Sequence, residues 1–301
     1  MKNTEIKIFS SGNWHDLPAQ TGYELLDTGE GEKLERFGKY TFVRPYEGAV
    51  WKKTLPLKDW AEVDGKFWSS KTGAKAGWKL NKEVPKKWEM SYEGVNFWAL
   101  PTPFRHLAFF PEQAPHWDFI EKQIKSAGRP IKFLNLFGYT GVASLFALRG
   151  GADVTHVDAS KQILTWVKDN QELSGMEKMP MRIIPEDAIK FLEREIKRGN
   201  KYDAVIMDPP KFGRGPKGET WKIEEDLGDL LSKVTKVLSN KPLFVVLTSY
   251  AIDASSLSLG NALTEATKDL HGVVTQGELC VTEKSKERII SLANTAVWSS
   301  L

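Results

Sequence analysis

The sequence predicts an α/β protein with a mainly parallel sheet in residues 105–301 and a smaller, mainly β domain in residues 1–104. From about residue 105 onward, strand-like runs alternate with helix-like patterns, which is typical of a parallel sheet with right-handed crossovers. The last two strand-like runs are long and are joined by the charged turn KSKE, so we expect an antiparallel hairpin at one sheet edge. Residues 1–104 instead contain short apolar runs separated by Gly, Pro and Asp-Gly.

The front half contains two patterns typical of β-hairpins. YELLDTGEGEKLERFGKYTFVRP (23–45) predicts two strands about a glycine-rich turn. WEMSYEGVNFWALP (88–101) predicts a second hairpin about Glu93-Gly94. Seven of the eleven tryptophans lie in this half, at positions 14, 51, 60, 68, 78, 88 and 98.

The sequence pattern of residues 105–301 predicts seven strands, with a helix between each successive pair of the first five. The helices end at glycine or at turn residues, as helix termini commonly do. We expect strands over 131–137, 153–158, 181–185, 202–208, 242–249, 273–283 and 288–300, and helices over 141–151, 160–175, 187–199 and 224–239.

Composition excludes several classes of protein. Of the residues, 41% are hydrophobic and 27% charged, which is usual for a globular protein. The first residues contain no apolar core of signal-peptide length, and no later stretch approaches the ~20 apolar residues of a membrane helix, so we expect a cytoplasmic protein without a membrane span. The single cysteine, Cys280, cannot form an internal disulfide, and the five histidines lie at 15, 106, 116, 156 and 271, so no metal is expected.

Residues 66–88 combine cations with aromatic rings. Seven lysines (66, 71, 75, 79, 82, 86 and 87) stand against one acid, Glu83, and tryptophans lie among them. Lysines neutralise phosphates and flat rings stack on bases, so the pattern suits single-stranded nucleic acid. It suits equally a solvated lysine-rich face whose tryptophans pack inward.

The predicted strand 131–137 runs directly into a glycine-containing turn with Gly138 and Gly141. The spacing differs from the G-x-G-x-x-G of dinucleotide-binding proteins, and a mere tight turn is one reading. Asp158 ends the second strand, where a carboxylate accepts hydrogen bonds from ribose hydroxyls. Asp187 follows the third strand, either as the N-cap of a helix or as a partner of an adenine amino group.

The motifs NLFGYTG, HVDAS, PEDAIKFL and DPPKF, in this order and with the terminal hairpin, resemble the class I S-adenosylmethionine-dependent methyltransferases. The resemblance covers about residues 105–301 and is greatest to the bacterial 23S ribosomal RNA methyltransferases with a DPP-x-F motif. It implies a Rossmann-like, seven-stranded fold, S-adenosylmethionine as cofactor and RNA as substrate. Residues 1–104 do not match the RNA-binding module of the family's best-known members, and their role as a substrate-binding module is an expectation.

The resemblance also implies roles for single residues. The loop Phe137, Gly138, Tyr139, Thr140 and Gly141 would hold the methionine part of the cofactor. Asp158 with Ala159 would hold the ribose, and Asp187 with Ala188 would contact adenine. In FPEQAPHW (110–117), Glu112 and Gln113 would complete the pocket, although an exposed polar loop is an equal alternative.

The stretch VIMDPPKFGRG (205–215) raises the question of substrate. Two prolines stop a strand and stiffen the backbone. Asp208, Pro209 and Pro210 would fix the target nitrogen beside the cofactor, and Phe212 would pack on an unstacked base. The alternative is a strand that simply ends at two prolines. We expect Lys211, Arg214 and Lys217 to contact substrate, although Lys211 could equally face solvent, and we expect the glycine-rich GRGPKGETW to form a basic lid.

Methylation of carbon 5 of a pyrimidine needs a cysteine nucleophile beside the target. Here DPPKF contains no cysteine, Ser249 stands at the end of the fifth strand, and Cys280 lies inside the predicted hairpin as a packed residue. The sequence therefore favours transfer to a nitrogen, ahead of oxygen. The alternatives are a methyltransferase of proteins or small molecules and a non-catalytic RNA-binding protein with the same fold; a nicotinamide-dependent dehydrogenase is disfavoured by the glycine spacing.

Overall fold

The computed structural model describes residues 5–11, 13–68, 76–215, 218–250 and 254–300. The chain forms two compact units. The sheet unit comprises Met1–Phe9, Pro115–Leu279 and Ser291–Leu301, and the front unit comprises Ser10–Ala114 and Cys280–Ile290. Each unit therefore takes segments from distant parts of the sequence.

The sheet unit contains an eight-stranded sheet among the described residues, in the order β1-β16-β17-β15-β12-β9-β10-β11. Strands β11, β10, β9, β12 and β15 are parallel, and β17 is antiparallel to β15. The predicted α/β fold with its terminal antiparallel hairpin is confirmed. The strands are β1 (Ile6–Ser10), β9 (Lys132–Leu136), β10 (Asp153–Asp158), β11 (Met181–Pro185), β12 (Ala204–Met207), β15 (Phe244–Ser249), β16 (Gly272–Thr282) and β17 (Ile289–Ser300).

The sheet has one strand more than the seven predicted. The additional strand is β1, whose residues were predicted to belong to the front domain. It pairs with β16 at the sheet edge. The approach is close at Gly277, where an added Cβ would lie 1.8 Å from the carbonyl oxygen of Lys7. A long-range pairing of this kind leaves no local pattern in the sequence.

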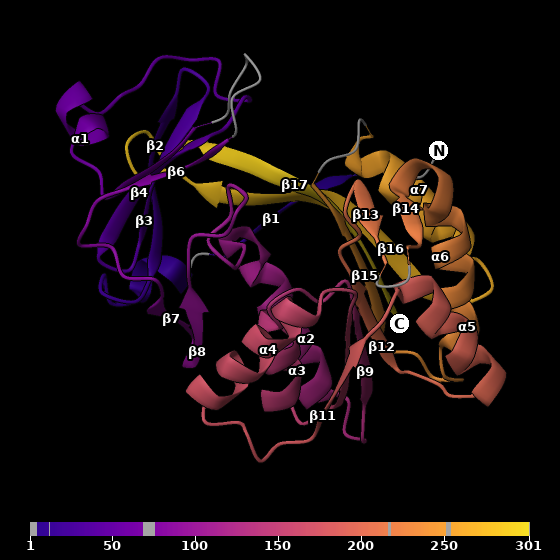
Figure 1. Ribbon diagram of the computed structural model, residues 1–301. Helices are drawn as coiled ribbons and strands as arrows, with labels where there is room; N and C mark the ends of the chain where they lie inside the picture. The colour runs from indigo at the N-terminus through magenta and orange to yellow at the C-terminus, as the bar shows by residue number, and fades with distance from the viewer. Residues whose placement is uncertain (1–4, 12, 69–75, 216–217, 251–253, 301) are drawn as a thin grey trace. The chain divides into compact units, whose positions relative to one another are not determined.

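Helices cover both faces of this sheet, as Figure 1 shows. Helices α2 (Ala114–Ser126), α3 (Val142–Arg149) and α4 (Lys161–Leu173) lie on one face, and α5 (Ala188–Arg198), α6 (Ile223–Val237) and α7 (Ser256–Ala266) lie on the other. Helices α2 and α7 were not predicted. The core under α5, α6 and α7 includes Leu134, Leu136, Val157, Phe191, Met207, Leu230, Val234, Leu247, Leu259 and Trp298.

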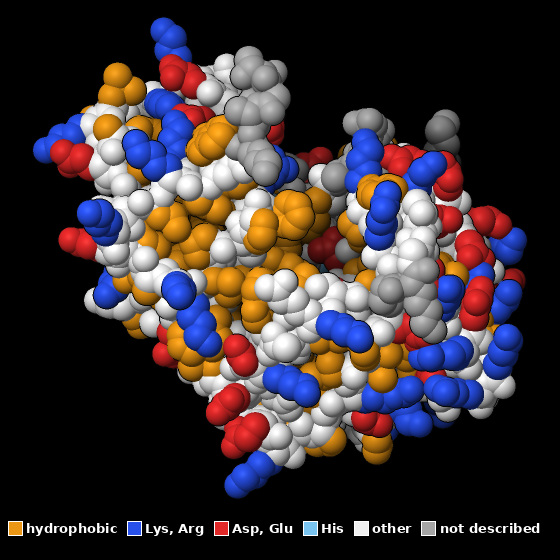
Figure 2. Space-filling model, in the orientation of Figure 1, with side chains coloured by type: hydrophobic (Ala, Val, Ile, Leu, Met, Phe, Trp, Pro, Cys, Tyr) orange, Lys and Arg blue, Asp and Glu red, His pale blue; other side chains and the backbone are white. Residues whose placement is uncertain are grey.

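The outward surface of α5 and α6 carries both signs of charge. Figure 2 shows basic and acidic side chains intermixed there. The ion pairs include Arg194 with Glu186 and Lys233 with Asp229. Such a surface favours solvation over attraction of one sign of partner. No helix in the described part of the chain is long and apolar enough to cross a membrane.

The front unit contains a five-stranded sheet and a two-stranded one. The five-stranded sheet has the order β2 (Tyr23–Gly29), β3 (Glu32–Phe37), β4 (Tyr40–Pro45), β5 (Gly65–Trp68) and β6 (Gly77–Leu80). The second sheet is the hairpin of β7 (Trp88–Tyr92) and β8 (Val95–Ala99). Short helices are η1 (Asn13–Asp16), α1 (Leu57–Ala61) and η2 (Pro111–Gln113).

One hairpin prediction in this unit is confirmed and the other is corrected. The β7–β8 turn lies at Glu93 and Gly94, whose φ angles of 48° and 77° match the left-handed turn that favours glycine. Residues 23–45 form three strands where two were predicted. A second tight turn at Gly38, with φ 63°, reverses the chain between β3 and β4.

A charged cluster lies inside the front unit. Glu35 on β3 is fully buried, and its two carboxylate oxygens accept hydrogen bonds of 2.6 and 2.7 Å from the guanidinium of Arg44 on β4. The Lys33 ammonium lies 3.2 Å from Glu35, and the Tyr23 hydroxyl donates to it. The partners offset the desolvation cost of burying the carboxylate.

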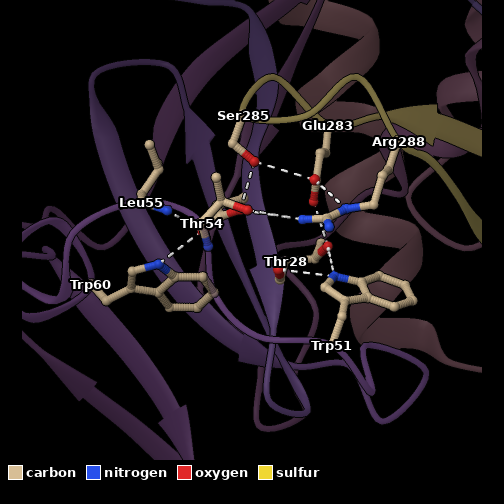
Figure 3. A network of polar contacts seen from close by, with 9 residues as sticks. Thr28, Trp51, Thr54, Leu55, Trp60, Glu283, Ser285 and Arg288 are labelled. Atoms are coloured by element: carbon tan, nitrogen blue, oxygen red, sulfur yellow. Dashed lines mark hydrogen bonds and ion pairs between the residues drawn. The ribbon is translucent and has the colours of Figure 1, made fainter.

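The tip of the β16–β17 hairpin belongs to the front unit because a polar network holds it there (Figure 3). Buried Asp27 on β2 accepts hydrogen bonds from the Ser285 hydroxyl at the tip and from the backbone N–H of Thr54. Glu283 accepts from Arg288 and from Thr28. The front unit is therefore completed by residues that follow Ala114 by more than 160 positions in the sequence.

Candidate functional site

The carboxyl ends of neighbouring parallel strands place the predicted site residues along one edge of the sheet. Leu136, the last residue of β9, pairs in register with Val157 on β10 and with Met207 on β12. The next residues along the chain are Phe137, Asp158 and Asp208. Because parallel strands run side by side, these three residues follow adjacent strands at the same level.

The loop after β9 has an unusual backbone. Phe137 and Tyr139 have φ angles of 56° and 51°, in the left-handed region that non-glycine residues rarely adopt, and Gly141 has φ 85°. The N–H of Gly138 donates to the carbonyl of Val157, which fixes the loop to β10. The backbone carbonyl of buried Thr140 accepts a hydrogen bond from the side-chain amide of Asn170. Left-handed backbone at non-glycine residues costs ~1–3 kcal/mol each and is concentrated at functional sites.

Gly138 has no room for a side chain. A Cβ there would lie 2.3 Å from a carbon of the His156 imidazole. His156 is buried beneath the loop, where its Nδ1 lies 3.0 Å from the Ser144 hydroxyl, and Ser144 also accepts from the Asn135 amide. Burial lowers the pKa of His156 to about 4, so the ring is neutral at pH 7. The glycine is therefore required by packing against His156.

Asp158 presents a carboxylate at the end of β10. Its oxygens accept hydrogen bonds from the backbone N–H groups of Tyr139, at 3.0 Å, and Ser160, at 2.9 Å. Burial raises the pKa of this carboxyl, and the two backbone hydrogen bonds oppose that rise. A carboxylate oxygen accepts a second hydrogen bond readily, so donors such as ribose hydroxyls fit this site.

Asp187 is the N-cap of α5, which confirms one of its two readings. Its Oδ1 accepts a hydrogen bond from the N–H of Lys190. Asp187 lies two residues after Pro185, which pairs with Asp158 in the sheet. Ala188 is 4% exposed and its side chain packs in the core. Ala159, between Asp158 and Ser160, is half-buried.

The Asp-Pro-Pro turn follows β12 and is held by a residue that the sequence pattern did not single out. Asp208 is half-buried, Pro209 buried and Pro210 exposed. The indole Nε1 of Trp221 donates to the carbonyl of Pro210. Trp221 is 4% exposed and its ring lies 5.2 Å from that of Phe137, centroid to centroid. No local signal distinguishes this tryptophan from an ordinary core residue.

Trp221 lies in a small hairpin formed by the predicted lid. Strands β13 (Phe212–Arg214) and β14 (Thr220–Lys222) pair so that Gly213 stands opposite Trp221. The Phe212 side chain is 53% exposed. Lys211 and Arg214 are also exposed, with Lys211 3.8 Å from Glu224. Lys217 lies outside the described residues.

Glu112 and Gln113 lie in η2 of the front unit. The alternative of an exposed polar loop is wrong, because the two residues are 6% and 8% exposed. Burial raises the pKa of Glu112. The charges of Lys33 and Arg44 and a hydrogen bond from its own backbone N–H act in the opposite direction but do not cancel the rise. Their predicted contact with the cofactor stays a prediction.

Three observations bear on the type of chemistry. Cys280 is buried in β16, as expected for a packed residue. Ser249, at the end of β15, is 2% exposed. Within the described residues no group of three or more His, Cys, Asp or Glu could hold a metal ion.

Residues 117–238 match the model of the family described as Conserved hypothetical protein 95. The ribosomal RNA large subunit methyltransferase K/L of Shewanella loihica is 35% identical over 147 residues, which is 46% of this chain and 20% of that protein. The chain thus covers about a fifth of this curated relative's length. A putative methyltransferase complexed with SAH shares the fold at 16% identity, with a TM-score of 0.71, over 93% of this chain and 76% of that one.

The crystal structure of a SAM-dependent methyltransferase from Agrobacterium tumefaciens is similar over nearly the whole length. It is 41% identical, with a TM-score of 0.91, over 98% of this chain and 94% of that one. The similarity includes both units, and the glycine loop and Asp158 fit the cofactor of such an enzyme. The chain belongs to the S-adenosylmethionine-dependent methyltransferases.

Proposed function

We propose that this methyltransferase acts on a base nitrogen of RNA, with ribosomal RNA as the favoured substrate. The observation that carries the proposal is the position of the Asp208-Pro209-Pro210 turn, which follows β12 directly beside the β9 loop, with exposed Phe212 two residues on. The similarity to ribosomal RNA large subunit methyltransferases K/L supports RNA as the class of substrate.

The assigned cofactor contacts follow the strand order. The β9 loop, Phe137 to Gly141, receives the methionine part, Asp158 accepts from the ribose hydroxyls, and Asp187 contacts adenine at the start of α5. When bound, S-adenosylmethionine supplies a methyl group on a positively charged sulfur. The left-handed backbone of Phe137 and Tyr139 shapes the loop before the ligand arrives, which lowers the ordering cost of binding.

The Asp-Pro-Pro turn would align the target nitrogen. The carboxylate of Asp208 and the carbonyl of Pro209 accept hydrogen bonds from the amino group and direct its lone pair at the methyl. Alignment supplies most of the rate enhancement in such a transfer, because a positioned nucleophile reacts as a unimolecular partner. The amino nitrogen would release one proton on methylation, and the Asp208 carboxylate would accept it.

Phe212 would hold the base once it leaves its stack. A flipped or single-stranded base needs a flat apolar surface to replace its lost neighbours. The Phe212 ring is exposed at the start of β13, and Lys211 and Arg214 on either side would contact phosphates.

The experiment that tests the proposal is nucleoside mass spectrometry of ribosomal RNA from a deletion strain. The expected result is the loss of one N-methylated nucleoside, restored by the wild-type chain and not by an Asp208→Ala variant. RNA as the substrate would be refuted if the nucleoside profile is unchanged and the purified enzyme methylates proteins of a cell extract but not RNA.

A further inference from the structure

In the five-stranded sheet of the front unit, one face of β5 and β6 carries exposed side chains and is left open by the described residues. In their antiparallel register Lys66 stands opposite Lys79, and Trp68 stands opposite Gly77. Directly opposed residues point to the same side of a sheet, and so do residues two apart in a strand. Lys66, Trp68, Lys79 and Gly77 therefore share one face.

The other two tryptophans of the lysine-rich stretch pack inward. Trp78 contacts Phe42 and Phe67, with centroids 5.7 and 5.3 Å apart, and its indole donates to the carbonyl of Thr102. Trp88 is 7% exposed and stacks on Phe42. The inward-packing reading is thus right for these two residues. Trp68 differs, because 43% of it is exposed.

The exposed face of β5 and β6 continues onto β3 and β4, where the same side of the sheet is covered. Lys66 pairs with Val43 on β4, and Val43 packs with Leu34 and with Trp60 of α1 in a small core. Helix α1 therefore covers β3 and β4 on this side, and the same side of β5 and β6 carries exposed residues. An uncovered sheet face with an exposed aromatic ring is how several RNA-binding modules present bases with a stacking surface.

The charge on this face is positive. Lys66 and Lys53 share one carboxylate, Glu32, at 2.6 and 2.7 Å, which leaves this group with a net positive charge. Lys79 is exposed beside them on β6. Gly77 opposite Trp68 has no side chain to lie against the indole. Positive charge beside an accessible flat ring complements a single-stranded phosphate backbone with unstacked bases.

We infer that Lys66, Trp68 and Lys79 form a platform that binds single-stranded RNA, with a base stacked on Trp68 and phosphates beside the two lysines. This inference rests on the proposed function for its choice of RNA. It assigns to the front unit a substrate-gripping surface separate from the residues of the sheet unit that act on the target base.

The test measures binding of the full chain to fluorescein-labelled 12-nucleotide oligouridine by fluorescence anisotropy at several salt concentrations. Trp68→Ala is expected to weaken binding ~5- to 100-fold, as stacking of ~1–3 kcal/mol per base implies. Trp68→Phe should retain most of the affinity. Lys79→Gln should reduce the slope of log K against log salt by ~0.7, the value for one phosphate contact in a single strand.

Matched controls are Leu57→Ala and Lys58→Gln, an exposed apolar residue and an exposed lysine on α1 of the same unit, which should bind as wild type does. A duplex should bind more weakly than the single strand, because its bases remain stacked. Affinities of Trp68→Ala and Lys79→Gln within twofold of the controls would overturn the inference, as would tighter binding of the duplex.

The same variants separate this inference from the proposed function. If the wild-type chain methylates ribosomal RNA, Trp68→Ala is expected to raise KM for the RNA while kcat at saturating RNA is kept. Unchanged KM and affinity in that variant refute the platform and leave the methylation proposal standing. If the chain binds oligouridine through Trp68 but methylates no RNA, the platform stands and the methylation proposal is refuted.

Discussion

The indole nitrogen of Trp221 donates a hydrogen bond to the carbonyl oxygen of Pro210, 2.6 Å away. The same ring packs on Phe137 in the loop that follows β9. One side chain thus contacts both the loop that follows β9 and the turn that follows β12. It therefore holds the Asp-Pro-Pro turn in place beside that loop.

Trp221→Phe should keep the ring packing and remove the hydrogen bond. We expect kcat for RNA methylation to fall ~3- to 10-fold, about the value of one neutral hydrogen bond, with the dissociation constant of S-adenosylmethionine within twofold of wild type. Steady-state kinetics and calorimetry measure the two quantities. Trp88→Phe is the control, since it loses an indole hydrogen bond to the Phe37 carbonyl in the front unit. Equal losses of kcat in both variants would mean that Trp221 has only a structural role.

Asp158→Ala should weaken cofactor binding at least tenfold, because a hydrogen bond to a charged group contributes ~1.5–3 kcal/mol. Titration calorimetry with S-adenosylmethionine measures it. Asp153→Ala, an exposed acid at the start of the same strand, is the matched control. An affinity within twofold of wild type for Asp158→Ala would show that the ribose lies elsewhere.

The Asp158 carboxyl should also make cofactor binding pH-dependent. Burial raises its pKa in the free protein, and hydroxyl donors favour the ionised form, so binding should lower the pKa and release a proton. Affinity is expected to increase as the pH rises through the titration of this group. Asp158→Asn, which does not titrate, should show no such pH dependence.

Gly138→Ala should disrupt the loop that follows β9, the proposed cofactor loop, because the new methyl group would lie 2.3 Å from His156. We expect a loss of both thermal stability and cofactor affinity, and partial recovery in the double variant Gly138→Ala/His156→Ala, which removes the clashing ring. Gly228→Ala in α6 is the contrasting control, since nothing lies within 4 Å and the change should stabilise by ~0.5–1 kcal/mol. No recovery in the double variant would contradict the clash with His156 as the cause.

Cys280→Ala should leave kcat within twofold of wild type, because transfer to nitrogen needs no thiolate. Cys280 is buried, so this small apolar replacement keeps the packing. Thermal denaturation checks the fold of the variant. A well-folded variant that binds the cofactor and no longer transfers methyl groups would contradict nitrogen as the acceptor.

Glu35→Gln should destabilise the protein by ~3–5 kcal/mol at pH 7, because it leaves Arg44 buried without its counter-charge. Burial by itself raises the pKa of Glu35. The charges of Arg44 and Lys33 and the hydrogen bonds from Arg44 and Tyr23 outweigh that rise and lower the pKa to about 2. The folded pKa lies below its ordinary value of 4.5, so this stabilisation is present above pH 4.5 and is lost as the pH falls toward 2.

Urea denaturation at pH 7 and at pH 3 measures the effect of Glu35→Gln. The difference in unfolding free energy between the variant and wild type should shrink at the lower pH. Glu62→Gln, in the exposed pair with Lys58, should change little at either pH. A Glu35→Gln effect that is the same at both pH values would contradict the assigned pKa.

Several elements could be predicted from the sequence because their signals are local. Strand β10 has the predicted bounds, 153–158, and so does β11, 181–185. Both are short β-type runs that end at polar or turn residues. Strand β9 ends one residue early, at Leu136, since the left-handed φ of Phe137 takes that residue out of the sheet.

Other features depend on contacts between residues far apart in the sequence. The register of β9, β10 and β12 brings the residues after them to one level, and no pattern around Asp208 could indicate that Trp221 holds the turn. Likewise, three tryptophans in residues 66–88 look alike in sequence, and only packing on Phe42 separates Trp78 and Trp88 from the exposed Trp68.

The sequence by itself determined the α/β class and the alternation of strands and helices from β9 to β15, because hydrophobic periodicity and glycine turns are local properties of the chain. The resemblance of its motifs to a known family indicated the cofactor. The tertiary structure decided that β1 joins the large sheet, that the tip Glu283 to Arg288 completes the front unit, and that Trp221 meets Pro210. Each of these depends on burial and hydrogen bonding between distant segments, which become favourable only once the whole chain is folded.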